Sequence, residues 1–299
     1  QRPSVTYMPG LRRAIFQGGE SGVSAVVDYV HISTLGNAVD WGDLSQARQS
    51  PTGIGTLIKG FVAGGALASG YTDDVDETIF ATRGNYARFG DLSDGRSNLG
   101  GLNNATRGVF GGGYTPDPGA RTNIIDYITL ASGGSASDFG DLTSVADIAN
   151  NAAASSTRGI WMGKNSPSAK TIDYITIAST GNAADFGDMA ADDRTKSGCS
   201  NSIRAVGAAG HVSNVIEYLT MASTGNGTDF GDLTVSRGGG AAAASPTRAI
   251  FAGGAEPADS NIIDYITIAS TGDAADFGDR TVALKYVSGA TESHGGLSG

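Results

Sequence analysis

A repeat of 44–50 residues runs through nearly all of the 299-residue chain and constrains its fold more than any other feature. Its clearest copy extends from residue 245 to residue 279 and contains Ser-Pro-Thr-Arg, a Gly-Gly doublet, Ile-Asp-Tyr-Ile-Thr-Ile and Asp-Phe-Gly-Asp. Repeats with a period of about 20–50 residues are typical of solenoids, propellers and arrays. An acidic residue before the Tyr position marks six copies, at Asp28, Asp76, Asp126, Asp173, Glu217 and Asp264.

Each copy has the pattern of four short strands. In the sixth copy we expect strands at 240–244, 248–252, 261–268 and 274–277, separated by Ser, Pro and Gly turn residues. The third segment does not alternate strictly between polar and apolar residues, which indicates a sheet covered on both faces. Six such units predict an all-β fold, a six-bladed β-propeller with four-stranded blades.

The two ends of the chain are predicted to meet in one blade. The first copy begins at Arg13 without a small-residue strand before it, and residues 287–291 resemble that missing strand. We therefore expect the propeller to span residues 13–299 after an N-terminal arm of residues 1–12. Residues 281–299 would close the ring by completing the first blade, which removes open sheet edges.

The composition excludes several classes of protein. Twenty Lys and Arg against thirty Asp and Glu give a net charge of −10, which disfavours nucleic-acid binding because phosphate contacts need clustered cations. No apolar run approaches the length of about 18 residues that a membrane helix needs, so no membrane insertion is expected. The one cysteine, Cys199, cannot form an internal disulfide and is predicted to be an inert buried thiol.

The repeated charged positions have structural explanations. The Asp-Phe-Gly-Asp segment is predicted to be a blade turn with a buried Phe and with Asp side chains that cap backbone N–H groups. The acidic run at 73–77 lacks the spacing of a calcium loop, so we expect a solvated loop rather than a metal site. A basic residue at the start of each second strand is predicted to pair with the repeated Asp residues rather than form a positive ring; it is found at Arg13, Lys59, Arg107, Arg158, Arg204 and Arg248.

These features together resemble kelch repeats. A Gly-Gly doublet ends the second strand, a Tyr lies in the third and an aromatic residue lies in the fourth. A basic residue often follows, at Arg48, Arg96, Arg194 and Arg237, with Lys285 as a substitute in the last copy. Copies four and five depart from the doublet, with Gly163-Lys164 and Ala209-Gly210, and the third copy lacks the basic residue.

Residues 173–188 are similar to repeats in virion proteins of tailed bacteriophages, notably marine and cyanobacterial phages. Their sequence is Asp-Tyr-Ile-Thr-Ile-Ala-Ser-Thr-Gly-Asn-Ala-Ala-Asp-Phe-Gly-Asp. The resemblance covers roughly residues 13–296. It implies a propeller on the virus particle, as a tail, fibre or head-decoration component.

Variable loops follow the glycine doublets, and all six are expected on one face of the disc. A rigid scaffold with variable loops commonly carries recognition. The loops at 66–74 and 114–123 are the longest and hold aromatic residues outside the repeat beside charged ones, a combination suited to carbohydrate or protein contact. The candidate contact residues are Tyr71, Asp73, Asp74, Tyr114, Asp117 and Arg121, and the alternative is an ordinary solvated loop.

The sequence predicts no cofactor, no metal and no catalytic residue, because no nucleophile–base or paired-carboxylate arrangement stands out from the repeated Asp background. The expected function is a non-enzymatic structural protein of the phage virion, present in multiple copies as a tail fibre or capsid decoration protein. Its partners would be other virion proteins and a host-surface glycan or protein. Two alternatives stay open: a glycan-cleaving propeller and a cellular kelch-type interaction scaffold.

Overall fold

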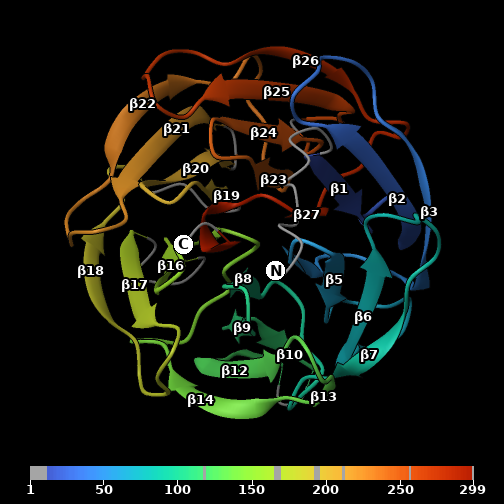
Figure 1. Ribbon diagram of the computed structural model, residues 1–299, viewed down its shortest axis with the longest axis vertical. Helices are drawn as coiled ribbons and strands as arrows, with labels where there is room; N and C mark the ends of the chain where they lie inside the picture. The colour runs from blue at the N-terminus through green and yellow to red at the C-terminus, as the bar shows by residue number, and fades with distance from the viewer. Residues whose placement is uncertain are drawn as a thin grey trace, which may run out of the picture.

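The computed structural model describes residues 12–116, 119–164, 170–191, 196–210, 213–255 and 257–297. Within them, six four-stranded antiparallel blades form a ring around a central axis (Figure 1), which confirms the predicted six-bladed propeller. In each blade the first of the four strands lies nearest the axis and the fourth lies at the outer rim (Figure 1). In the sixth blade they cover 241–244, 248–252, 262–267 and 275–279, within two residues of the predicted bounds.

The strands of the first three blades include two short additions. Blade 1 contains β27 (Ser288–Thr291), β1 (Arg13–Gln17), β2 (Ser24–His31) and β3 (Val39–Arg48). Blade 2 contains β4 (Thr52–Gly55), β5 (Lys59–Ala63), β6 (Asp74–Ile79) and β7 (Ala87–Asp91), extended by β13 (Gly134–Ser135). Blade 3 contains β8 (Gly100–Asn103), β9 (Arg107–Gly111), β12 (Ile124–Thr129) and β14 (Ser137–Asp141), with a hairpin of β10 (Tyr114–Thr115) and β11 (Ala120–Arg121) beside it.

The last three blades follow the repeat closely. Blade 4 contains β15 (Ala152–Ala154), β16 (Arg158–Met162), β17 (Thr171–Thr176) and β18 (Ala184–Asp188). Blade 5 contains β19 (Ser197–Ser200), β20 (Arg204–Gly210), β21 (Ser213–Thr220) and β22 (Thr228–Asp232). Blade 6 contains β23 (Ala241–Ala244), β24 (Arg248–Ala252), β25 (Ile262–Thr267) and β26 (Ala275–Asp279). The described chain ends with a 3-10 turn, η1 (Gly295–Leu297).

Blade 1 closes the ring as predicted. The C-terminal strand β27 pairs antiparallel with β1, with Ile15 opposite Ala290, and the red β27 lies beside the dark blue β1 in Figure 1. The backbone N–H of Arg13 also donates to Glu292 Oε1 at 2.9 Å. The first blade is therefore built from both ends of the described chain.

The inner strands are made of small residues because their backbones pack tightly around the axis. A Cβ on Gly53 would lie 2.5 Å from the carbonyl oxygen of Gly289, and one on Gly289 would lie 2.3 Å from that of Ala242. The axial cavity that remains has a volume of only about 50 Å³. At this cavity His294 Nε2 lies 2.8 Å from the Gly55 oxygen. Elsewhere Asn150 Nδ2 donates to the Val287 oxygen at 3.3 Å, which links blade 4 to blade 1.

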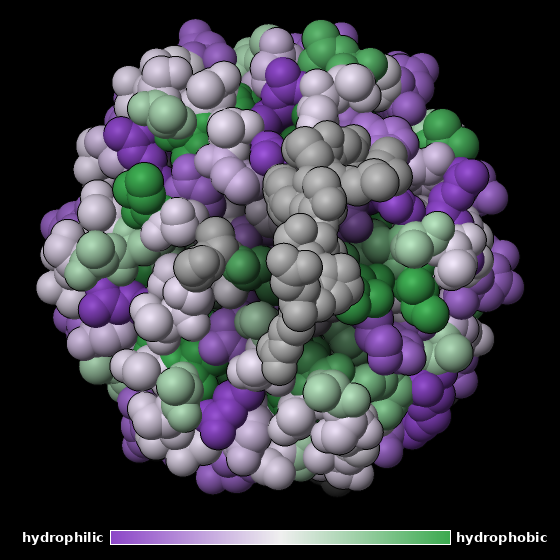
Figure 2. Space-filling view, in the orientation of Figure 1, coloured by the Kyte–Doolittle hydropathy of each residue, from purple (hydrophilic) through white to green (hydrophobic). Residues whose placement is uncertain are grey.

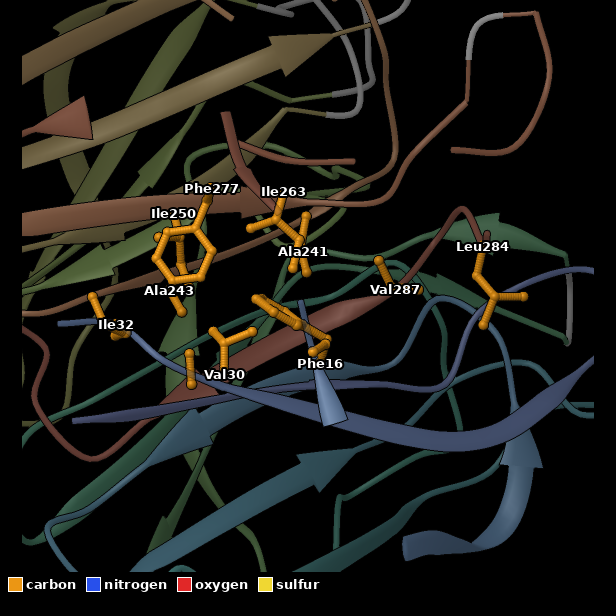
Figure 3. Close-up of a cluster of buried hydrophobic side chains, with 13 residues drawn as sticks. Phe16, Val30, Ile32, Ala241, Ala243, Ile250, Ile263, Phe277, Leu284 and Val287 are labelled. Atoms are coloured by element: carbon orange, nitrogen blue, oxygen red, sulfur yellow. The ribbon is translucent and has the colours of Figure 1, made fainter. Parts of the chain in front are cut away.

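The hydrophobic core lies between neighbouring blades rather than at the axis. Figure 3 shows one cluster, in which Phe16 and Val30 of blade 1 face Ile250 and Phe277 of blade 6. Related clusters fill the other interfaces, and each Tyr of the third strand packs edge-on against the aromatic ring of the fourth. On the face seen in Figure 2, outside the grey region, apolar residues form separate groups among polar ones.

The Asp-Phe-Gly-Asp segment forms the outer strand, not a turn, and it joins blades. Gly140 has a φ of +144°, and a Cβ there would lie 2.6 Å from the backbone of Gly181 in the next blade. Gly181 donates its N–H to the Phe139 oxygen at 2.7 Å, and Asn182 Oδ1 accepts the Asp141 N–H at 3.0 Å. Capping of these N–H groups thus comes mainly from the following blade, which corrects the predicted role of the Asp side chains.

A buried cation neutralises the repeated acidic residue in all six blades. In blades 2, 3 and 6 the cation is the Arg of the preceding repeat that the sequence singled out, at Arg48, Arg96 and Arg237. Three blades take the cation from another position, so Lys285 is not the substitute predicted for the last copy. The pairs are Arg48–Asp76, Arg96–Asp126, Lys164–Asp173, Lys196–Glu217, Arg237–Asp264 and Arg280–Asp28. Arg194 lies outside the described residues.

The departure at Lys164 has a steric reason. A Cβ on the second glycine of a regular doublet, Gly65, would lie 3.3 Å from the side chain of Arg48, which passes over it. The segment before blade 4 carries Ala146 in place of that Arg, so the space is free. Lys164 occupies the doublet position and reaches Asp173 at 2.8 Å with a fully buried side chain.

The basic residue that begins each second strand does not pair with the repeated Asp, so that prediction was wrong. In four blades the guanidinium lies 4.5–4.9 Å from the centre of its own blade's Tyr ring and donates to a carbonyl oxygen of the next blade. These residues are Arg107, Arg158, Arg204 and Arg248. Lys59 pairs with Glu77 and Arg13 with Glu292 instead. The four Arg side chains thus join neighbouring blades, and the other two cations are in ion pairs within their own blades. The six cations are therefore not a free positive ring.

Candidate functional site

The loops that join second to third strands emerge on one side of the disc, together with the segments that enter the inner strands. We call this side the loop face. The residue after each glycine doublet forms backbone hydrogen bonds with such a segment, as Ala66 does with Gln49 and Tyr114 does with Ser97. Glu20 donates its backbone N–H to the Lys285 oxygen at 2.8 Å in the same way. The loops are thus fixed to the frame at their bases.

Tyr71 and Tyr114 form an aromatic pair on the loop face. Their ring centres are 6.2 Å apart and the rings are tilted by 54°. Both side chains are half-buried. The hairpin β10–β11 positions Tyr114, whose hydroxyl donates to the Gly119 oxygen at 2.8 Å. Loops from blades 2 and 3 that lie 43 residues apart in sequence therefore present two adjoining rings that ligands can contact.

Arg121 lies opposite Tyr114 in the same hairpin. Its Nε donates to Asp147 Oδ2 at 3.0 Å, and the Arg side chain stays exposed while Asp147 is buried. Burial raises the pKa of the Asp147 carboxyl, and the nearby Arg121 opposes that rise. Asp147 was not among the predicted site residues, because the sequence marked its segment only by the lack of the repeated basic residue, which Ala146 replaces.

Asp73 and Asp74 belong to a second group, at the start of β6. Asp74 begins β6 opposite Asp91 at the end of β7, and carboxylate oxygens of these three Asp residues lie within 4.8 Å of one another. The Arg88 guanidinium forms ion pairs with both Asp74 and Asp91. A side-chain cation is thus already paired with two carboxylates of this cluster. Nothing in the sequence indicated this pairing, because Arg88 and Asp91 belong to a different segment of the repeat from the acidic run.

The remaining titratable candidates have structural surroundings. Burial raises the pKa of the Cys199 thiol to about 12, which suits an inert group at an inner strand. Burial also lowers the pKa of His31, with Arg13 and Arg83 adding to the effect. Asp117 and His211 lie outside the described residues. In the described part of the chain, no helix has the length and apolar character that a membrane crossing requires.

The structure therefore brings together Tyr71, Tyr114 and Arg121 on adjoining loops. It groups Asp73 and Asp74 with Asp91, and Arg88 pairs with the last two. Comparison with known proteins adds no relative to this picture. No protein-family model matches the chain, and no curated protein shows significant similarity to it.

Proposed function

We propose that the chain is a non-enzymatic structural protein of a phage virion, and that its loop face attaches to a host surface or docks to another virion protein. The phage setting is supported by the resemblance of the repeat around residues 173–188 to virion repeats. The recognition role is supported chiefly by the Tyr71–Tyr114 pair. The centres of these two amphipathic side-chain rings are 6.2 Å apart, on loops anchored to the rigid propeller.

The physical basis of the proposed recognition is simple. Tyr supplies a large contact area at low conformational cost and keeps a hydroxyl for hydrogen bonding, so it is enriched at recognition surfaces. Arg121 adds an exposed cation at the same hairpin. Several copies on one particle would raise the effective concentration of a weak site, so modest affinity per copy is sufficient.

The test measures binding of the purified chain to a panel of bacterial envelope polysaccharides and to purified virion proteins, with assay of released reducing sugars. We expect saturable binding to at least one partner and no release. A double variant, Tyr71→Ala with Tyr114→Ala, should weaken binding at least tenfold, as expected for aromatic hot spots worth about 2 kcal/mol. The control is Ile203→Ala, which removes a side chain that is 65% exposed on the opposite face.

Two results would contradict the proposal. Release of sugars would show an enzyme instead, and unchanged binding of the double variant to every partner would remove the Tyr pair from the site. The phage setting has its own test, mass spectrometry of purified particles of a phage that encodes this chain. Absence of the chain from those particles would overturn the virion assignment while leaving the binding result intact.

A further inference from the structure

A second feature of the loop face is a polar pocket near the axis, with a volume of about 210 Å³. Its walls come from segments that enter the inner strands of four different blades and from the first loop residue of blade 1. We call it the axial pocket. The side chains that its chemistry depends on are those of Glu20, Gln49, Ser50, Asn98, Asp147 and Tyr286.

The backbone around the axial pocket is held in an unusual conformation. Ser50, Asn98, Ala149 and Tyr286 all have φ between +51° and +56°, a region that costs non-glycine residues about 1–2 kcal/mol each. Backbone hydrogen bonds join three of them one after another around the axis. Ser50 donates its N–H to the Tyr286 oxygen, and Asn98 donates its N–H to the Ser50 oxygen. Strain of this kind clusters at functional sites, and here it surrounds one cavity.

The charges of the axial pocket are already balanced. Glu20 Oε1 lies 3.8 Å from Lys285 Nζ, and Asp147 Oδ2 accepts the Arg121 Nε–H at 3.0 Å. The two carboxylates therefore give little drive to bind a cationic ligand. An anionic ligand would meet carboxylate oxygens on two sides of the cavity, which opposes its entry.

Neutral hydrogen-bonding groups form the rest of the wall. Within the described residues, the side-chain amides of Gln49 and Asn98 and the phenol of Tyr286 make no hydrogen bond. Amides both donate and accept, and a Tyr ring adds an apolar surface with a polar tip. The volume is below the roughly 300–1,000 Å³ of clefts that hold drug-sized molecules. These properties suit one small ligand with many hydroxyl groups.

We propose that the axial pocket binds one neutral sugar residue, such as the terminal residue of a glycan. The inference rests on the proposed recognition role of the loop face and gives it a ligand class. Backbone hydrogen bonds connect the wall of the pocket to the two loops that carry the Tyr pair. Gln49 is hydrogen-bonded to Ala66, and Ser97, the neighbour of Asn98, is hydrogen-bonded to Tyr114. A glycan chain could therefore occupy the pocket with its end and contact Tyr71 and Tyr114 along its length.

The experiment titrates the full chain with a panel of neutral hexoses and N-acetylhexosamines by ligand-observed saturation-transfer NMR. D-glucose and D-glucuronate form a matched pair that differs only in the oxidation of carbon 6. Two variants address the wall, Gln49→Ala and Asn98→Gly, the second of which keeps the left-handed backbone without the amide. Ile203→Ala is the control, and thermal unfolding of each variant checks that the fold is retained.

We expect at least one neutral sugar to bind, each wall variant to weaken it at least tenfold, and D-glucuronate to bind more weakly than D-glucose. Any of three results would overturn the proposal: no binding across the neutral panel, binding unaffected by both variants, or equal binding of the two matched sugars. Failure of the proposed function looks different. In that case monosaccharide binding persists, but no polysaccharide or virion protein binds in a way that depends on Tyr71 and Tyr114.

Discussion

Replacing Lys164 with Gly should destabilise the protein strongly, because it leaves the Asp173 carboxylate buried without its cation. The Lys164 and Asp173 side chains are both fully buried and 2.8 Å apart. Removing one partner of a buried ion pair costs about 3–5 kcal/mol in the free energy of unfolding. At roughly 2–4 °C per kcal/mol, the melting temperature should fall by roughly 6–20 °C.

A second substitution should restore what the first removes. Ala146 has the same backbone hydrogen bond as Arg48 and Arg96, since Gly113 donates its N–H to the Ala146 oxygen at 2.7 Å. Lys164→Gly combined with Ala146→Arg would recreate the arrangement of blades 2, 3 and 6, in which an Arg passes over a glycine. We expect the double variant to recover most of the lost stability, whereas Ala146→Arg alone should destabilise by crowding a second cation beside Lys164.

The assay is thermal and urea-induced unfolding of the four proteins of this double-mutant cycle. Lys59→Ala is the control, because the Lys59–Glu77 pair is also short, at 2.6 Å, but its side chains are 23–30% exposed. An exposed pair contributes about 0–1 kcal/mol, so this variant should melt close to the wild type. The reasoning is refuted if Lys164→Gly also melts close to the wild type, or if Ala146→Arg fails to improve the Lys164→Gly variant.

Three further predictions rest on the closure of the ring, the buried Cys199 thiol and the half-buried His294 imidazole. Deleting residues 281–299 removes β27 and exposes the edge of β1, so the truncated chain should aggregate or lack a cooperative melting transition in calorimetry. Cys199 should resist alkylation at pH 8 in the folded protein and react once urea unfolds it, because burial raises its pKa to about 12. A native thiol that reacts at the unfolded rate would show that this strand is open. Burial lowers the pKa of His294 to about 4, below its usual 6.5, so the unfolded chain takes up the proton first. Stability should therefore fall as the pH drops from about 6.5 to 4, and a His294→Gln variant should lose less over that range in urea unfolding.

Much of the fold was predictable because the same strand and turn pattern recurs in six copies of the repeat. The strand at 248–252 was placed correctly at both ends, since Ser-Pro-Thr before it and Gly-Gly after it are strong turn signals. The outer strand was ended too early, at Phe277 instead of Asp279, because Gly278 looks like a strand terminator. In the structure Gly278 is at the close contact between blades, with a φ of +146°, and the strand continues through it.

The contacts between blades were less predictable. From the sequence, Arg107 was predicted to pair with a repeated Asp. It binds instead the backbone carbonyl oxygen of Ile177 in another blade, and a backbone group cannot be recognised from the type of residue that carries it. The Tyr71–Tyr114 pair was predicted as two candidates on one face, and the structure adds that their rings adjoin. The axial pocket could not be predicted, because its four left-handed residues share a backbone conformation but no common side chain; they are Ser50, Asn98, Ala149 and Tyr286.

The closure of blade 1 means that the covalent gap in the ring falls between an inner strand and its neighbour, where every other blade has a short turn. Glu292 and Arg13 are already in contact there. A short peptide linking residue 292 to residue 12, in place of the residues beyond them, would turn the six blades into a continuous covalent circle. New ends could then be opened at the turn between Gly55 and Lys59, or at its counterpart in any other blade, giving circular permutants with the same architecture.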